Sequence, residues 1–297
     1  MSTQDATRSE YQQDCETYYR LLRDVHSGVF TTEKRKAEEL DKSRYSDASH
    51  PDIRNLNSLI EILHRLCGDG PEVHGIDYGC GSHWFVDHVR RSFGWQAVGY
   101  DPDPLAIEIA RKRFPDSADY YRCLDPFRDG LPEEDGTQSF IFCNAVIQHF
   151  DNAELERTLA EMARVLRPGG YCMLIFKRWT DELAAGTDAI SESIRVLDAA
   201  SGKVMYQDPT MQKELAKLEP SRLAELDADQ RDGWRLLRFL HLDDLRETAN
   251  YFGLECADQH AAKEQEFPPS NVNYRGGKGV PTACLALQKS TSQLADS

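Results

Sequence analysis

The feature that most constrains the fold of this chain is residues 73–83, where an apolar segment runs into two closely spaced glycines. The stretch reads Val-His-Gly-Ile-Asp-Tyr-Gly-Cys-Gly-Ser-His. Its apolar part predicts a strand that ends near Asp77, Gly79 and Gly81 predict a tight turn, and the residues after Ser82 predict a helix. Backbone amides at the start of such a helix favour anionic or acceptor groups of a ligand. We therefore expect the rest of the chain to support this turn or to cover it.

Strands and helices alternate through the middle of the chain. Apolar runs predict strands at residues 73–78, 96–100, 120–124, 139–144 and 171–176, and helical spacing predicts helices between them, the clearest at 152–166. Further helices are expected from residue 51 and at 242–252, and further strands at 254–258 and 282–288. Connections this short imply a mainly parallel sheet of about seven strands with helices on both faces.

The chain divides into a core and three additions. We assign residues 51–177 and 239–290 to the core, and residues 291–297 to a disordered tail. Residues 1–50 are expected to be a helical lid, a dimerisation arm that would make the protein a homodimer, or partly disordered. Residues 178–238 are an insertion too long to lack structure, and we expect a helical cap with helices near 190–197 and 211–226.

Composition disfavours several classes of partner. The net charge of -15, without a long basic cluster, argues against nucleic acid, because phosphate contacts depend on Lys and Arg. No apolar run is long enough to span a bilayer and the polar start is unlike a signal peptide, so we expect a cytoplasmic protein without a membrane partner. None of the eight cysteines forms a Cys-x-x-Cys pair. We therefore expect buried, reduced thiols and no metal site.

Polar side chains follow the predicted strands at one edge of the sheet, where ligands of open parallel sheets bind. These strand ends carry Asp77, Asp101, Asp125 and Asn144. Asp101 lies about twenty residues after the glycine turn along the sequence. At this separation an acidic residue is expected to accept hydrogen bonds from the two hydroxyls of a ribose. The third glycine of the dinucleotide fingerprint is replaced by Trp84, whose bulk opposes close packing of helix on strand. An NAD-dependent oxidoreductase is therefore the less favoured alternative.

Several short motifs occur in a fixed order: Ile-Asp-Tyr-Gly-Cys-Gly at 76–81, Gly-Tyr-Asp-Pro at 99–102, Leu-Asp-Pro at 124–126, Phe-Cys-Asn-Ala at 142–145 and Leu-Arg-Pro-Gly-Gly at 166–170. With this set the chain resembles the class I S-adenosylmethionine-dependent methyltransferases, closely over 52–176 and more loosely over 242–288. The resemblance implies an α/β fold of three layers, with a Rossmann-like sheet whose last strand, 282–288, is antiparallel.

The resemblance also implies which residues hold S-adenosylmethionine. Its methionine portion would lie against Asp77 and the backbone of the motif residues Tyr78, Gly79, Cys80 and Gly81. Asp101 would accept from the ribose hydroxyls and Asp125 from the adenine amino group. The adenine ring would lie between Pro102 and Leu124, and Asn144 would line the site near the sulfonium.

The chain departs from the family pattern at two positions, and the second departure disfavours one class of methyl acceptor. Ser139 opens the fourth strand where the family often has an acidic residue. Asn144 is followed by Ala145, so the Asn-Pro-Pro-Tyr motif used on nucleobase amines is missing. This absence agrees with the charge in disfavouring methylation of nucleic acid.

Methyl transfer from a sulfonium is an in-line displacement that leaves S-adenosylhomocysteine, and it depends mainly on positioning and on exclusion of water. A general base is needed only where the acceptor must lose a proton. His149, just beyond the fourth strand, is the candidate for this base, and the alternative is that it only lines the pocket.

The insertion 178–238 and the loop 267–281 both follow strand ends at the ligand edge, so we expect them to enclose a small-molecule acceptor. Candidate contacts, each of which could equally be a packing anchor, are Tyr45, Trp179, Tyr206, Trp234, His241, Tyr274 and Arg275. A catalytically silent protein that binds the cofactor as a scaffold is a further alternative.

Overall fold

The computed structural model describes residues 9–11, 13–14, 17, 51–125, 129–188, 191–207, 215, 218, 220–224, 226–257, 265–266 and 280–291. The predicted arm 1–50 and tail 291–297 therefore lie almost entirely outside the described residues. In the described part, seven strands follow one another across the main sheet, in the order β3 (Tyr121–Cys123), β2 (Gln96–Asp101), β1 (His74–Tyr78), β4 (Gln138–Asn144), β5 (Leu166–Lys177), β11 (Thr282–Lys289) and β10 (Gln265–Glu266).

The strands from β3 to β5 pair in parallel, and β11 is antiparallel to β5. On its other edge β11 pairs antiparallel with β10 and with an additional strand, β9 (Leu254–Cys256). These two short strands consequently run in the direction of β5. The prediction of a mainly parallel sheet with an antiparallel final strand is confirmed.

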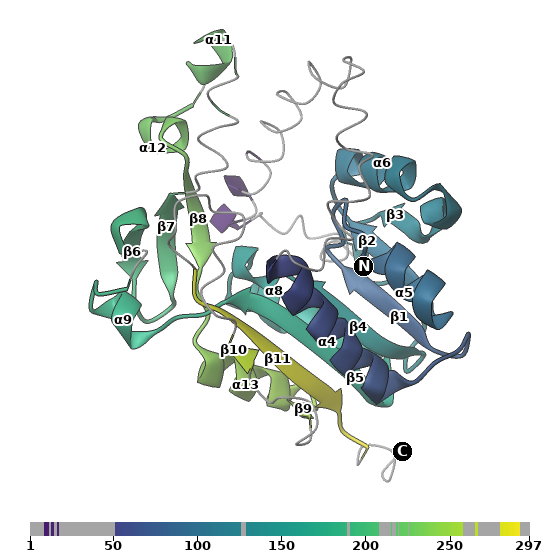
Figure 1. Cartoon of the computed structure of the whole chain (residues 1–297). Helices are drawn as coiled ribbons and strands as arrows, with labels where there is room; N and C mark the ends of the chain where they lie inside the picture. The colour runs from purple at the N-terminus through teal and green to yellow at the C-terminus, as the bar shows by residue number, and fades with distance from the viewer. Residues whose placement is uncertain are drawn as a thin grey trace, which may run out of the picture.

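Helices cover both faces of this sheet (Figure 1). α4 (Pro51–Cys67), α5 (Phe85–Phe93) and α6 (Pro104–Arg113) pack on one face, and α8 (Asn152–Val165) and α13 (Leu242–Tyr251) on the other. Local sequence fixes where α8 starts, because Asp151 and Glu154 form a reciprocal capping box. α6 begins at Pro104, directly after its N-cap residue Asp103. The carboxylate of Asp103 accepts a hydrogen bond from the backbone amide of Leu105.

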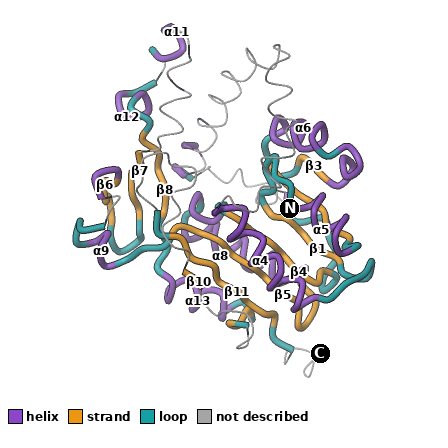
Figure 2. The backbone as a smooth tube through the Cα atoms, in the orientation of Figure 1, coloured by secondary structure: helices purple, strands orange, loops and turns teal. Residues whose placement is uncertain are grey.

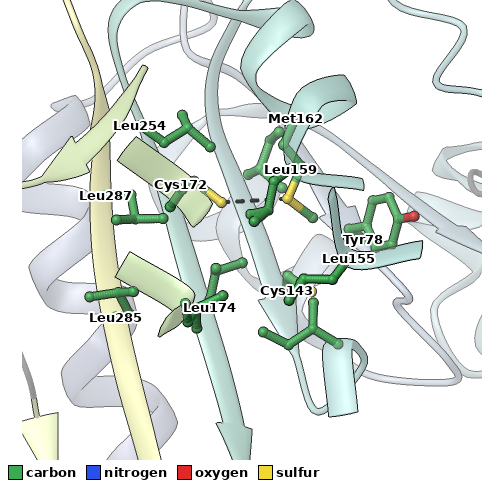
Figure 3. Close-up of a cluster of buried hydrophobic side chains, with 14 of the residues drawn as sticks. Tyr78, Cys143, Leu155, Leu159, Met162, Cys172, Leu174, Leu254, Leu285 and Leu287 are labelled. Carbon is green, nitrogen blue, oxygen red and sulfur yellow. Dashed lines mark hydrogen bonds between the residues drawn. The ribbon is translucent and has the colours of Figure 1, made fainter. Parts of the chain in front are cut away.

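Two apolar clusters lie between the layers. On the face of α8, Leu155, Leu159 and Met162 pack against Leu174 and Leu285 of the sheet (Figure 3). The opposite cluster is built from α4, α5, α6 and the other side of the strands, with members such as Leu59, Leu63, Phe85, Val89, Trp95 and Phe140. The sheet is thereby buried on both faces, as its nearly continuous apolar strands require.

The described cysteines are free, and Cys80, Cys143, Cys172 and Cys284 among them are buried while Cys123 is exposed. The Cys172 thiol lies 3.7 Å from the sulfur of Met162, which places it in the apolar core (Figure 3). Among the described residues no group of three metal-ligating side chains comes together. No helix in the described ranges combines the length and the apolar character needed to cross a bilayer.

The insertion corrects the expectation of a helical cap. Its described part contains a three-stranded antiparallel sheet of β6 (Ile194–Asp198), β7 (Lys203–Gln207) and β8 (Trp234–Arg238) (Figure 2). The helices beside it are short: α9 (Asp181–Ala184), η3 (Ser191–Ser193), α11 (Pro220–Leu223) and α12 (Ala228–Arg231).

A tight turn explains why residues 194–198 form a strand where we expected a helix. Asp198 accepts hydrogen bonds from the backbone of Ala200 and the hydroxyl of Ser201, and Gly202 has a φ of 71°. Asp and Gly at these positions are typical of turns, and the turn folds β6 back onto β7. Most of residues 211–219, the first part of the helix expected at 211–226, lie outside the described residues, and α11 covers part of the remainder.

The insertion leaves the core and returns to it at one point. The backbone amide of Leu240 donates to Lys177 at 2.9 Å, and that of Trp179 donates to the carbonyl of Leu240 at 2.9 Å. A small apolar cluster beyond this point gives the insertion a core of its own, formed by Trp179, Leu183, Val204, Tyr206, Leu237, Phe239 and Val280.

Candidate functional site

The glycine turn after β1 is held against the end of β2. The amides of Gly79 and Cys80 both donate to the carbonyl of Tyr100, at 2.8 and 2.9 Å. Gly79 has a φ of 71° and Gly81 a φ of 53°. A Cβ at Gly79 would lie 2.3 Å from a methyl carbon of Val146, so a larger residue would both strain the backbone and collide.

Asp77 and Asp101 are buried side by side at this turn, with 3% and 5% of their surface exposed. Asp101 accepts from the amides of Gly81 at 2.8 Å and Asp103 at 2.9 Å. Burial raises the pKa of Asp101 to about 6. Burial, and then the charge of Asp101, raise the pKa of Asp77 well above its ordinary value. Such a pair favours a ligand that brings hydroxyl donors or positive charge.

The end of β3 completes this edge. The amide of Leu124 donates to the carbonyl of Asp101 at 3.1 Å, and Leu124 and Asp125 are half-buried. Pro102, across from them, is exposed. The charge of Asp125 contributes to raising the pKa of Asp101, so the structure brings together the strand-end acids that the sequence placed at one edge.

Two of the predicted residues can offer only their backbone to a ligand at this edge, since their side chains lie in the core. The ring of Tyr78 is buried in the cluster on the α8 face, beside Leu155. The thiol of Cys80 belongs to the opposite cluster, and burial raises its pKa well above the ordinary value. Trp84, which precedes α5, is 8% exposed and packs in that same cluster.

A strained residue follows the half-buried Asn144 at the end of β4. Ala145 has a φ of 60°, a conformation that side chains other than glycine rarely adopt, and it is exposed. Its amide donates to the carbonyl of Ile175 at 2.8 Å, and the next residue, Val146, packs on Gly79. Sequence reasoning gave Ala145 no role, because alanine carries no signal for a positive φ.

His149 ends the short 3-10 turn η2 (Ile147–His149), which contacts both β5 and β8. Its Nδ1 is buried and has no hydrogen-bond partner in the described part of the chain. Burial, and then Arg235 and Lys177, hold the pKa of His149 well below its ordinary value. The imidazole is therefore neutral near pH 7, which suits either a weak proton acceptor or a polar pocket wall.

The other predicted acceptor contacts do not come together at one place. Trp179 packs beside the ring of His241, with 5.2 Å between centroids, and His241 Nε2 lies 2.9 Å from the carbonyl of Ala199. Trp234 is 7% exposed and lies under the guanidinium of Arg195. Tyr206 is buried in the apolar cluster of the insertion, and its ring centre lies 5.2 Å from the ammonium of Lys177 in β5. Outside the described residues lie Tyr45, Tyr274 and Arg275.

Sequence reasoning missed two buried cations near His149. Lys177 at the end of β5 is 9% exposed and Arg235 in β8 is 8% exposed. The carboxylate of Asp14 approaches Arg235, with 3.9 Å between Oδ2 and Nε. Charged residues inside the apolar runs 172–177 and 234–237 were the available signal, since such side chains are rarely buried without a reason.

Comparison with known proteins finds relatives of the part of the chain that carries the glycine turn. Residues 76–174, which include the glycine turn and all the strand-end residues named above, match the family model described as a methyltransferase domain. Over these residues the chain is similar to the methyltransferase domain family. A malonyl-(acyl-carrier protein) O-methyltransferase of Hahella chejuensis is 32% identical to it over 111 residues, which are 37% of this chain and 38% of that relative. The chain thus spans well under half of that curated relative.

Solved structures share the fold of this chain over most of its length. A structure from Methanosarcina mazei, described as a SAM-dependent methyltransferase, aligns with a TM-score of 0.53 at 16% identity, over 77% of this chain and 97% of that one. Geranyl diphosphate C-methyltransferase of Streptomyces coelicolor A3(2), solved with S-adenosyl-L-homocysteine, aligns with a TM-score of 0.50 at 13% identity, over 80% and 81%. The fold is that of the class I S-adenosylmethionine-dependent methyltransferases.

Proposed function

We propose that this protein transfers a methyl group from S-adenosylmethionine to a small-molecule acceptor. The observation that carries the proposal is the buried pair Asp77 and Asp101 at a glycine turn, inside a methyltransferase domain. Ionisation of two neighbouring buried acids is costly. A ligand that carries positive charge and a ribose diol would offset this cost by stabilising the ionised carboxylates. S-adenosylmethionine has both, and it supplies an activated methyl group for in-line displacement.

The residues of the crevice then take distinct tasks. Asp77 and the amides of the turn bind the methionine portion, and Asp101 exchanges part of its bonding to backbone amides for the ribose hydroxyls. Leu124 and Pro102 flank the adenine, with Asp125 at its amino group. Asn144 orients the reacting end, and neutral His149 either accepts a proton from the acceptor or walls its pocket.

The acceptor side of the proposal is supported by the insertion and by the comparisons. A three-stranded sheet rooted at the end of β5 stands next to the reacting edge, where it can exclude water. The relative from Hahella chejuensis acts, by its name, on malonyl-(acyl-carrier protein), and the enzyme from Streptomyces coelicolor A3(2) is named for geranyl diphosphate. A net charge of -15 supports an acceptor other than nucleic acid.

Calorimetry and a transfer assay test the two halves of this proposal. We expect S-adenosylmethionine and S-adenosylhomocysteine to bind with micromolar affinity and NAD not to bind. Binding of NAD alone would end the proposal. A screen of metabolites with methyl-labelled S-adenosylmethionine is expected to give at least one labelled product, and cofactor binding without any transfer would favour the scaffold alternative.

A further inference from the structure

A pocket of about 370 Å³ lies where the insertion meets the core, and we call it the Arg238 pocket. Its walls come from the N-terminal turns of α8 and α13, from the turn between β6 and β7, and from the end of β8. Among the described residues that line it, none belongs to the donor crevice. Its volume is within the range of small-molecule sites, about 300–1,000 Å³.

Two side chains of the pocket fix the turn between β6 and β7. Nε of Arg238 donates a hydrogen bond to the carbonyl of Ser201 at 3.0 Å. Nε2 of His241 lies 2.9 Å from the carbonyl of Ala199. Because Arg238 and His241 both line the pocket, the same side chains that shape it also hold its third wall in place.

Arg238 brings into the pocket a positive charge that the protein leaves partly unsatisfied. The residue is 9% exposed, and its Nη1 is buried with no hydrogen-bond partner in the described part of the chain. Burial lowers the pKa of Arg238, although Tyr11, Asp244 and Asp151 act in the opposite direction. A buried guanidinium with an unused donor is costly, so an anionic acceptor that reaches it from the pocket would stabilise the arrangement.

Two helices begin at this pocket. α8, of 14 residues, starts at Asn152, and α13, of 10 residues, starts directly after His241. The carboxylate of Asp151 caps α8, whereas His241 makes no side-chain capping bond to α13. The positive ends of both helix dipoles add to the charge of Arg238 and favour an anionic group in the pocket.

Three acids also line the pocket, and they lie toward the solvent. Glu156, Asp198 and Asp244 are all exposed, in contrast to Arg238. The carboxylate of Asp198 is occupied by hydrogen bonds within its own turn, which leaves Glu156 and Asp244 to face a ligand. These acids repel a ligand that carries negative charge alone, and Arg238 repels one that carries positive charge alone.

We propose that the Arg238 pocket binds a small zwitterion, with its carboxylate at Arg238 and its ammonium at Asp244 and Glu156. The planar guanidinium fits two oxygens of a carboxylate. Leu155 of α8 and Leu245 of α13 also line the pocket and provide apolar surface for the carbon skeleton. The site is separate from the donor crevice, so this inference goes beyond the proposed function and does not depend on it.

A ligand in this pocket would also fasten the insertion to the core. Arg238 belongs to the insertion, whereas Glu156 lies on α8 and Asp244 on α13 of the core. A zwitterion that contacts both sides binds only when they are together, so it stabilises that arrangement. We therefore expect a saturating zwitterion to slow proteolysis within the insertion.

The first test uses probes that differ in charge. Glycine, β-alanine and γ-aminobutyrate carry both charges at increasing separation, whereas butanoate and butylamine carry one charge each. Each probe is titrated into the whole chain by calorimetry. We expect at least one of the three zwitterions to bind, and butanoate and butylamine to bind about tenfold more weakly or not at all.

The carboxylate end is tested by replacing Arg238. Arg238→Met is expected to weaken binding of that zwitterion about tenfold or more, with partial recovery in Arg238→Lys. Arg195→Met is the matched control, since Arg195 lies on β6 of the same insertion and pairs with Asp229. This control should bind the zwitterion as the wild type does.

The ammonium end is tested at an exposed position, where the fold is not at risk. Asp244→Asn is expected to weaken binding of the zwitterion about two- to fivefold, without weakening that of butanoate. Asp243→Asn is the matched control, because Asp243 is the neighbouring acid, pairs with Arg246 and is not among the residues that line the pocket.

The inference is refuted if none of the three zwitterions binds, or if butanoate or butylamine binds as tightly as the best of them. It is also refuted if Arg238→Met binds that zwitterion as well as Arg195→Met does. Circular dichroism shows whether each variant is folded, and if Arg238→Met is not, Arg238→Lys and Asp244→Asn decide. Competition between the zwitterion and S-adenosylhomocysteine would place the ligand in the donor crevice and refute a separate site.

Discussion

Replacing Asp101 with asparagine is expected to stabilise the protein at neutral pH while weakening cofactor binding. Burial raises the pKa of Asp101 from 3.8 to about 6, and the group is 5% exposed. The difference, 6 minus 3.8, is about two, and each pKa unit corresponds to about 1.4 kcal/mol. The ionised carboxylate therefore costs the folded protein about 3 kcal/mol above pH 6.

The sign of the pH dependence follows from proton binding. Because the pKa of Asp101 is higher in the folded state, the folded protein binds more protons between about pH 4 and pH 6, and its contribution to stability falls as pH rises through this window. Asparagine resembles the protonated carboxyl and does not titrate. We expect Asp101→Asn to be about 2–3 kcal/mol more stable than the wild type at pH 7.5 and equally stable near pH 4.

Urea unfolding at both pH values measures this difference, with the exposed Asp116→Asn as the control for loss of a charge. Calorimetry at pH 7.5 should show S-adenosylmethionine binding about 10- to 100-fold more weakly to Asp101→Asn, because charge-assisted hydrogen bonds to the ribose are lost. The reasoning is refuted if the variant is less stable at pH 7.5, or if the difference from the wild type is the same at both pH values.

Three further changes test other parts of the structure. Gly79→Ala should lower the free energy of unfolding in urea by about 1–3 kcal/mol more than Gly94→Ala does. The two glycines have similar φ values of 71° and 73°, but a Cβ would collide with Val146 only at Gly79. Equal losses in the two variants would contradict this reasoning. In pH profiles of kcat, His149 should give no limb above pH 6.5, and a limb near 7 that His149→Gln removes would be evidence against its lowered pKa. Trp179→Ala should lower the free energy of unfolding by about 3–5 kcal/mol and make the insertion more sensitive to proteolysis. If the variant resists proteolysis as well as the wild type does, Trp179 does not anchor the insertion.

The strand ends and the glycine turn could be predicted from sequence because each depends on local rules. Apolar runs gave β1, β2 and β3, and parallel pairing then requires Asp77, Asp101 and Asp125 to meet at one edge. No long-range information beyond the alternation of strands and helices was needed. The family motifs lie in this same region.

The insertion could not be predicted in the same way. Its strands are short and carry charged residues, as in Ile194–Asp198, so periodicity does not distinguish a strand from a helix. Burial of Lys177 and Arg235 depends on the packing of β8 against η2, which brings together residues far apart in the sequence. The positive φ of Ala145 is likewise imposed by its surroundings, here the bond to Ile175 and the packing of Val146 on the glycine turn.

The point at which the insertion leaves and re-enters the core has an evolutionary consequence. Since the backbone of Leu240 bonds directly to Lys177 and Trp179, the segment between them can change in length and sequence without altering the register of the main sheet. Under the proposed function, donor binding and acceptor choice would be encoded in separable stretches of the gene. Exchange of this stretch between related enzymes would then be a direct route to new acceptor specificities on an unchanged donor site.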